Sequence, residues 1–158
     1  MAILEAVNLK EAKVRNARYM GGDYRDDIIP YGAFSGKKSL VYFAFPEIVT
    51  HICQDAFRSS NLSGALILPD DVVTIRGYAF AYTNIGSVTF GNKLETIGGN
   101  AFRNCSSLSS ELLLPNSLKT IQESAFYCCN LQGKLILPNS LESIGAGAFQ
   151  FAGHFSGD

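Results

Sequence analysis

Two adjacent carboxylates, Asp70 and Asp71, are the first residues of this sequence that suggest chemistry. Paired acids carry out acid–base catalysis where a cleft raises the pKa of one of them. Here they follow the apolar segment 66–69, LILP, where aspartate after proline is typical of a turn. Because a surface turn is hydrated, the sequence favours a structural role for both acids over an acid–base site.

Four cysteines and two histidines are the other candidates for chemistry. The vicinal pair Cys128–Cys129 lacks the Cys-x-x-Cys spacing of redox motifs, and the cysteine spacing matches no zinc template. His51 and His154 are far apart in the sequence. We therefore predict no metal site, no cofactor and no catalytic site, and expect that the protein is not an enzyme.

The composition narrows the possible partners. The chain has 158 residues, which fits one domain, and its 13 basic residues nearly balance 14 acidic ones. This balance gives no electrostatic reason to expect nucleic acid or anionic lipid as a partner. No run of about 18 apolar residues is present, and charges such as Glu5 and Lys10 interrupt the N-terminal segment. We expect no membrane insertion and no signal peptide in this chain.

An internal repeat organises most of the sequence. Ala-Phe pairs recur every 22 to 24 residues, at 33–34, 56–57, 79–80, 101–102, 125–126 and 148–149. An isoleucine stands four residues before each of these alanines, at Ile29, Ile52, Ile75, Ile97, Ile121 and Ile144. The shared motif is Ile-x-x-x-Ala-Phe.

A second motif lies between the Ala-Phe pairs. Two apolar residues, two apart, precede Pro or Gly in FAFP (43–46), LILP (66–69), VTFG (88–91), LLLP (112–115) and LILP (135–138). The alternation predicts a short strand, which proline ends because it has no N–H to donate. Six residues after each Pro or Gly comes the next isoleucine, so a turn and a second short extended segment follow.

One such unit cannot bury its own apolar residues, so the units are expected to stack into a solenoid. Stacking at about 4.8 Å per coil would place the six phenylalanines in one column. Cys105 and Cys129 each follow their phenylalanine by three residues and would be neighbours. We expect buried free thiols, because cysteine behaves as a small apolar residue. A redox pair is the alternative, although parallel stacking does not favour its side-chain directions.

The motifs together resemble the BspA-like leucine-rich repeat family. Leu-x-Leu-Pro, Ser-Leu-x-x-Ile and AFRNCSSL (101–108) carry the resemblance, which covers about residues 29–152. It implies a right-handed solenoid of about six coils, with a parallel sheet on one face and short turns or 3₁₀ segments on the other. Members are mostly surface or secreted adhesion proteins of anaerobic bacteria and some mucosal parasites. The resemblance thus implies an extracellular or cell-surface location.

We expect a single domain, residues 1–158, with irregular ends. Segment 1–14 is predicted to be a degenerate first coil, although an amphipathic helix is the alternative, and 15–27 an inserted loop. Regular repeats then occupy 28–152, and 153–158 is a truncated or uncapped end. Because solenoid ends need caps, the chain is either a fragment of a longer protein or self-associates through its ends.

Two columns of residues are predicted to point outward beside the inward Leu-x-Leu positions. The first comprises Ala44, Ile67, Thr89, Leu113 and Ile136, and the second includes Tyr42, Ala65, Ser87, Glu111 and Lys134. The first column is unusually apolar for a hydrated face. Such side chains either stabilise cross-strand pairs or form a binding surface.

The function predicted from these features is recognition. We expect a non-enzymatic adhesion module that binds a protein or glycan through the concave sheet face, at Tyr42, Ala44, Ile67, Thr89, Glu111, Leu113, Lys134 and Ile136. The alternative is a structural spacer or display stalk in a larger surface protein.

Overall fold

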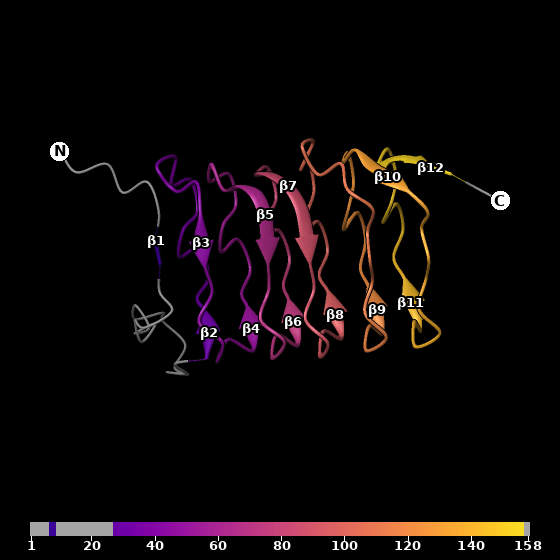
Figure 1. Cartoon of the computed structure of the whole chain (residues 1–158), viewed down its shortest axis with the longest axis horizontal. Coiled ribbons are helices and arrows are strands. Elements are labelled where there is room, and N and C mark those ends of the chain that lie inside the picture. The colour runs from indigo at the N-terminus through magenta and orange to yellow at the C-terminus, as the bar shows by residue number, and fades with distance from the viewer. Residues whose placement is uncertain (1–6, 9–26, 157–158) are drawn as a thin grey trace.

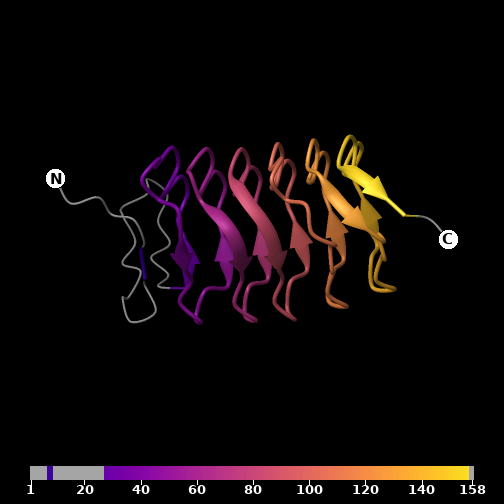
Figure 2. The same ribbon diagram turned by 45° about the horizontal axis from the view of Figure 1, so that its top comes forward.

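The computed structural model describes residues 7–8 and 27–156. This part of the chain forms a β-solenoid of about six coils, which follow one another along the long axis of the molecule, and it contains no helix (Figure 1). Strands β5 and β7 point the opposite way from β6 and β8, so the chain runs up one face of each coil and down the other (Figure 1 and Figure 2). The solenoid predicted from the repeat is confirmed.

The first face carries one continuous sheet of six parallel strands, in the order β11-β9-β8-β6-β4-β2. These strands are β2 (Ile28–Ile29), β4 (His51–Ile52), β6 (Thr74–Ile75), β8 (Thr96–Ile97), β9 (Thr120–Ile121) and β11 (Ser143–Ile144). Each isoleucine of the motif lies opposite that of the next coil, as Ile75 lies opposite Ile97. We call this side the Thr-Ile face.

The second face, the Leu-x-Leu face, carries separate parallel pairs instead of one sheet. The pairs are β1 (Val7–Asn8) with β3 (Phe43–Ala44), β5 (Ser63–Ile67) with β7 (Asn84–Thr89), and β10 (Leu131–Gly133) with β12 (Gly153–Phe155). A single bridge joins Leu113 to Ile136. The continuous sheet thus lies on the face built by the second extended segment, not on the Leu-x-Leu face where we had placed the candidate surface.

The spacing of the motifs varies at one place in the coil. From Pro or Gly to the next isoleucine the distance is always six residues, as from Pro69 to Ile75. From each corner phenylalanine to the next Pro or Gly it is 12, 12, 11, 13 and 12 residues. The variable segment leads into the Leu-x-Leu strands, and a register shift between Gly64 and Ala65 absorbs one residue of it. Beyond this shift the Leu-x-Leu pairs are in register, as Leu66 lies opposite Val88, so the variation is confined to the residues that precede them.

The Ala-Phe motif forms the corner that joins the two faces. In every described coil, the residue before the alanine and the second residue after the phenylalanine have positive φ, as at Asn100 (58°) and Asn104 (57°). These two left-handed positions turn the chain sharply. Neighbouring corners are linked by backbone hydrogen bonds, in which the Phe102 N–H donates to the Ala125 carbonyl oxygen at 2.8 Å.

The phenylalanine column fills the core, as predicted. Successive rings are stacked with centroids 5.1 to 5.3 Å apart from Phe34 to Phe149. The four inner rings are fully buried, while Phe34 and Phe149 at the two ends are half-buried. The alanine before each inner ring is also fully buried, as expected for a tight corner.

The two ends of the chain are described only in part. Strand β1 pairs with β3 so that Val7 lies opposite Phe43, which is the register of the sequence match between the first segment and a regular coil. The other residues of the predicted first coil, and the predicted loop 15–27 except Asp27, lie outside the described residues. Strand β12 falls in the predicted terminal segment 153–158.

Candidate functional site

The two adjacent acids lie in the turn that follows the Leu-x-Leu strand of their coil. The Asp70 carboxylate accepts a hydrogen bond from the Asn92 backbone N–H at 3.3 Å, and Asp71 forms an ion pair with Lys93. This bonding and the negative charge of Asp71 raise the pKa of Lys93. Both contacts join one coil to the next at an exposed turn, so these acids act as turn and inter-coil residues.

Two of the four cysteines, Cys105 and Cys129, are buried donors to the corner backbone. The Cys105 thiol donates to the Phe80 carbonyl oxygen at 3.1 Å, and Cys129 donates to the Phe102 carbonyl oxygen at 3.2 Å. Burial raises the pKa of Cys105 to about 11 and also raises that of Cys129, so both remain protonated near neutral pH. All four cysteines are free, which confirms the prediction of buried free thiols. The sequence analysis did not predict that these thiols donate hydrogen bonds. The available signal was Thr83, which occupies the same position of its coil and has a hydroxyl that donates in the same way.

The histidines do not come together. His51 lies in β4 and His154 in β12, at distant coils of the solenoid. Within residues 7–8 and 27–156, no three His, Cys, Asp or Glu side chains gather where they could hold a metal ion. The same part of the chain has no helix of the length and apolar character needed to cross a membrane.

The outward column predicted on the Leu-x-Leu face forms an exposed apolar row. The side chains of Ile67, Leu113 and Ile136 are 67%, 69% and 65% exposed, and Thr89 is exposed between them. Ile67 lies directly opposite Thr89, and Leu113 opposite Ile136. We call these four residues the outer stripe. They form one row across four successive coils.

The remaining residues predicted on this face differ in how exposed they are. Tyr42 is half exposed, and Glu111 and Lys134 are also exposed. Ala44 is only 7% exposed, which corrects the prediction that it points into solvent. It lies in β3 opposite Asn8 of β1, and its methyl group projects less from the sheet than the side chains of Ile67, Leu113 and Ile136. The apolar row therefore begins at Ile67.

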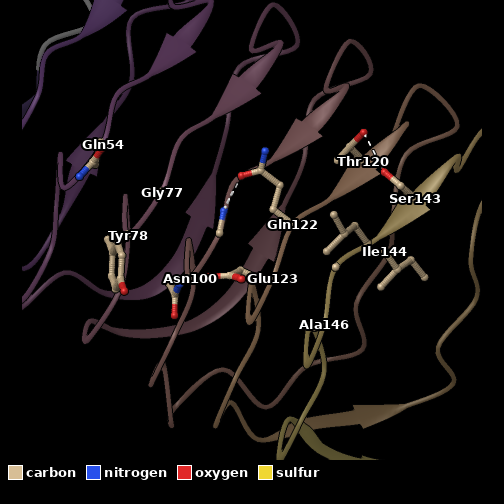
Figure 3. A pocket seen from close by; sticks show the side chains of 13 residues that line it. Gln54, Gly77, Tyr78, Asn100, Thr120, Gln122, Glu123, Ser143, Ile144 and Ala146 are labelled. Carbon is tan, nitrogen blue, oxygen red and sulfur yellow. Dashed lines mark hydrogen bonds between the residues drawn. The ribbon is translucent and has the colours of Figure 1, made fainter.

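A groove of about 680 Å³ lies on the other side of the molecule, over the Thr-Ile face and the adjoining corner. Polar side chains from successive coils surround it, as Figure 3 shows for Gln54, Tyr78, Asn100, Thr120, Gln122 and Glu123. It is shallow and largely open to solvent. Sequence reasoning missed this groove. The available signal was the glycines at 77 and 99, which lack side chains where neighbouring coils have long ones.

The groove side chains are held in place by their own contacts. The Gln122 side-chain oxygen accepts a hydrogen bond from the Gly99 N–H at 2.9 Å, and Ser143 donates to the Thr120 hydroxyl at 3.3 Å (Figure 3). The Arg58 guanidinium lies 4.9 Å from the centre of the Tyr78 ring. The site therefore combines fixed hydroxyl and amide groups with one aromatic ring.

The chain matches a known protein family. The model of the BspA type leucine-rich repeat region matches residues 27–154 in six copies. This chain belongs to the BspA type leucine-rich repeat family. The match covers the same repeats that the Ile-x-x-x-Ala-Phe motif defines, so the resemblance inferred from the sequence is confirmed.

Solved structures share the fold of this BspA type chain. A leucine rich cell surface protein from Faecalibacterium prausnitzii A2-165 is 22% identical over 94% of this chain, with a TM-score of 0.60. The T. pallidum leucine-rich repeat protein is 23% identical over 97% of this chain, with a TM-score of 0.61. The chain spans 45% of the first protein and 79% of the second. A search of curated proteins found no match.

Proposed function

We propose that this chain is a non-enzymatic recognition module that binds a protein partner through the outer stripe, at the surface of a cell. The observation that carries the proposal is the exposure of Ile67, Leu113 and Ile136, each by about two-thirds, in one row. Leu113 and Ile136 lie side by side, and adjacent exposed apolar side chains are a feature of interaction surfaces. The family and the cell-surface protein from F. prausnitzii support the location.

The chemistry of the stripe favours a protein over a glycan. Isoleucine and leucine side chains have no hydrogen-bond donors or acceptors, whereas a glycan requires many of both. Covering such side chains with an apolar partner contributes about 1.5–3 kcal/mol for each one fully buried. Tyr42, Glu111 and Lys134 would then form the polar rim around the apolar stripe.

A spacer or display stalk is the second candidate. The uninterrupted phenylalanine column supports it, because stacked coils with a continuous core form a stiff rod. A spacer would need no ligand of its own, so the two candidates differ in whether the outer stripe contacts anything.

A charged double substitution separates them. Leu113→Lys with Ile136→Glu places two charges on the stripe, while Asn92→Lys with Asn116→Glu places the same charges in exposed turns as a matched control. The probe is fluorescently labelled protein on cultured mucosal epithelial cells. We expect the control to bind like the wild type and the stripe variant to bind at least tenfold more weakly. Trypsin treatment of the cells should abolish binding.

Two results would contradict the proposal. If the stripe variant bound the cells as well as the wild type does, the outer stripe would not be part of the interface. Absence of cell binding by the wild type would favour the spacer.

A further inference from the structure

The floor of the groove on the Thr-Ile face is bare backbone. Gly77 and Gly99 occupy one column, and the coils on either side of them carry Gln54 and Glu123 at the equivalent position. The two missing side chains thus leave a hollow between two long polar ones (Figure 3). The backbone of the floor is accessible at the place where the sheet meets the corner.

The walls of the groove offer the two kinds of contact that a sugar ring needs. Tyr78 supplies an aromatic surface, against which the C–H face of a pyranose can pack. Gln122 and Glu123 are exposed and supply a planar amide and a carboxylate group, which can bond to pairs of neighbouring hydroxyls. Thr120 adds a hydroxyl at the sheet itself.

The tyrosine ring is fixed before any ligand arrives. Arg58 lies over the ring and forms an ion pair with the buried Asp55 at 3.2 Å. Because the guanidinium that contacts the ring is itself paired with Asp55, the ring has a fixed neighbour on one face and loses less freedom when a ligand binds, which favours affinity.

Charge and spacing narrow the ligand class further. Glu123 is the one charged side chain among the residues that line the groove, so the site suits a neutral ligand better than an ionic one. The groove extends across successive coils, from Gln54 to Ser143. Parallel strands repeat at about 4.8 Å, which is close to the length of one sugar in an extended β-1,4-linked chain. Each sugar of such a chain would advance by about one coil, and alternate sugars, which present the same face, would lie about two coils apart.

We propose that this groove binds a neutral, extended β-1,4-linked oligosaccharide, which lies along the solenoid axis with one sugar on Tyr78. The site is independent of the outer stripe, because the two lie on different faces of the coils and share no residue. Nothing in its chemistry requires the ligand to be cleaved, so the activity proposed is binding.

The test is a titration of the ¹⁵N-labelled chain with chitohexaose and with cellohexaose, followed by NMR. We expect saturable shifts at Gly99, Asn100 and Gln122 with at least one of the two. Maltohexaose, whose α-1,4 linkage gives a coiled chain, should bind at least tenfold more weakly. Equal binding of maltohexaose, or no saturable shift with any of the three, would overturn the proposal.

Filling the floor gives the sharper test. Gly99→Gln adds a long side chain where a Cβ would lie 3.5 Å from the Glu123 carbonyl oxygen, an ordinary contact, so the fold should persist. Gly86→Gln is the matched control on the other face, where the Cβ would lie 3.7 Å from its nearest neighbour. We expect the first to abolish oligosaccharide binding and the second to preserve it. Binding that survives Gly99→Gln in the folded variant would place the ligand elsewhere.

Tyr78→Asn tests the aromatic contact. Tyr78 has a φ of 56°, and Asn100 occupies the equivalent position of the next coil with a φ of 58°, so asparagine suits this left-handed backbone. We expect at least tenfold weaker binding, equivalent to about 1.4 kcal/mol. An unchanged affinity would exclude the ring from the site.

Discussion

The two faces of this solenoid come from one repeat, yet only the Thr-Ile face forms a continuous sheet. Its strands follow Pro or Gly at a constant distance of six residues, whereas the strands of the Leu-x-Leu face follow a segment of variable length. We therefore expect the segment of constant length to determine the stacking of this solenoid. We expect the variable segment to accept insertions without disturbing the stacking.

The outward residues of the two faces also differ in chemistry. Thr74, Thr96, Thr120 and Ser143 line the continuous sheet, while Ile67, Leu113 and Ile136 project from the Leu-x-Leu face. The polar column adjoins a groove, and the apolar column is exposed. One repeat has thus produced two surfaces of different chemistry.

The largest effect is expected from Phe102→Ala, because this ring lies in the core that both faces share. It is fully buried and stacked between Phe80 and Phe126 at 5.3 and 5.2 Å. We expect a loss of about 3–5 kcal/mol in the free energy of unfolding, measured with chemical denaturant. Phe34→Ala, at a half-buried end of the column, should cost less. Equal losses would show that the column does not act as a continuous core.

Inserting one residue tests the difference between the faces directly. A glycine after Ser117 lengthens the constant segment and displaces Ile121 from its buried position, which should cost roughly 2–5 kcal/mol, as for the loss of a buried isoleucine. A glycine after Ser106 lengthens the variable segment and should cost far less. Denaturation midpoints of the two variants measure the contrast. If both insertions cost the same, constant spacing does not determine the stacking.

The buried thiols of Cys105 and Cys129 should make the free energy of unfolding depend on pH. Burial raises the pKa of Cys105 from 9.0 to about 11, so the folded chain holds this proton more tightly than the unfolded chain. Its contribution is complete below pH 9 and falls as pH rises toward 11, by about 1 kcal/mol at pH 10. Cys129 acts in the same direction.

Replacing both thiols provides the control for this pH effect. Cys105→Thr with Cys129→Thr uses the residue that Thr83 places in the same column. The double variant should lose less stability than the wild type between pH 8 and pH 10. Parallel stability curves for the two proteins would show that these thiols do not titrate on unfolding.

The smallest effect is expected on the outer stripe. Ile67→Thr should change the free energy of unfolding by no more than about 0.5 kcal/mol, because Ile67 is 67% exposed. Ile75→Thr, in the same coil, should be strongly destabilising, since Ile75 is fully buried on the Thr-Ile face. A large loss for Ile67→Thr would mean that the stripe stabilises the fold, and would weaken its proposed role in binding.

The sequence was sufficient to predict the solenoid and its core. The motif positions that Phe102 and Ile97 represent recur at a nearly fixed period, so both columns could be predicted from the repeat alone. The continuous sheet on the Thr-Ile face was harder to predict, since it depends on register accumulated over all coils. The burial of Ala44 was not predicted, because the repeat assigns the same outward direction to every residue of its column and does not specify how far each one projects.

The groove could not be predicted for a different reason. It arises from side chains that are missing at Gly77 and Gly99, and their absence matters only once Gln54 and Glu123 are placed beside them. The contact of Arg58 with Tyr78 likewise joins two coils through long side chains, whose directions the motif does not specify.

The stacked corners also determine how this molecule would respond to mechanical force. Each coil contacts mainly its two neighbours, through hydrogen bonds such as that from Phe102 to Ala125 that run along the axis of the stack. Tension applied between the two ends would load these bonds a coil at a time. Each detached coil would release 22 to 24 residues of chain, an extension of about 75 Å at roughly 3.3 Å per residue. Such a module would lengthen in steps under load before it failed as a whole.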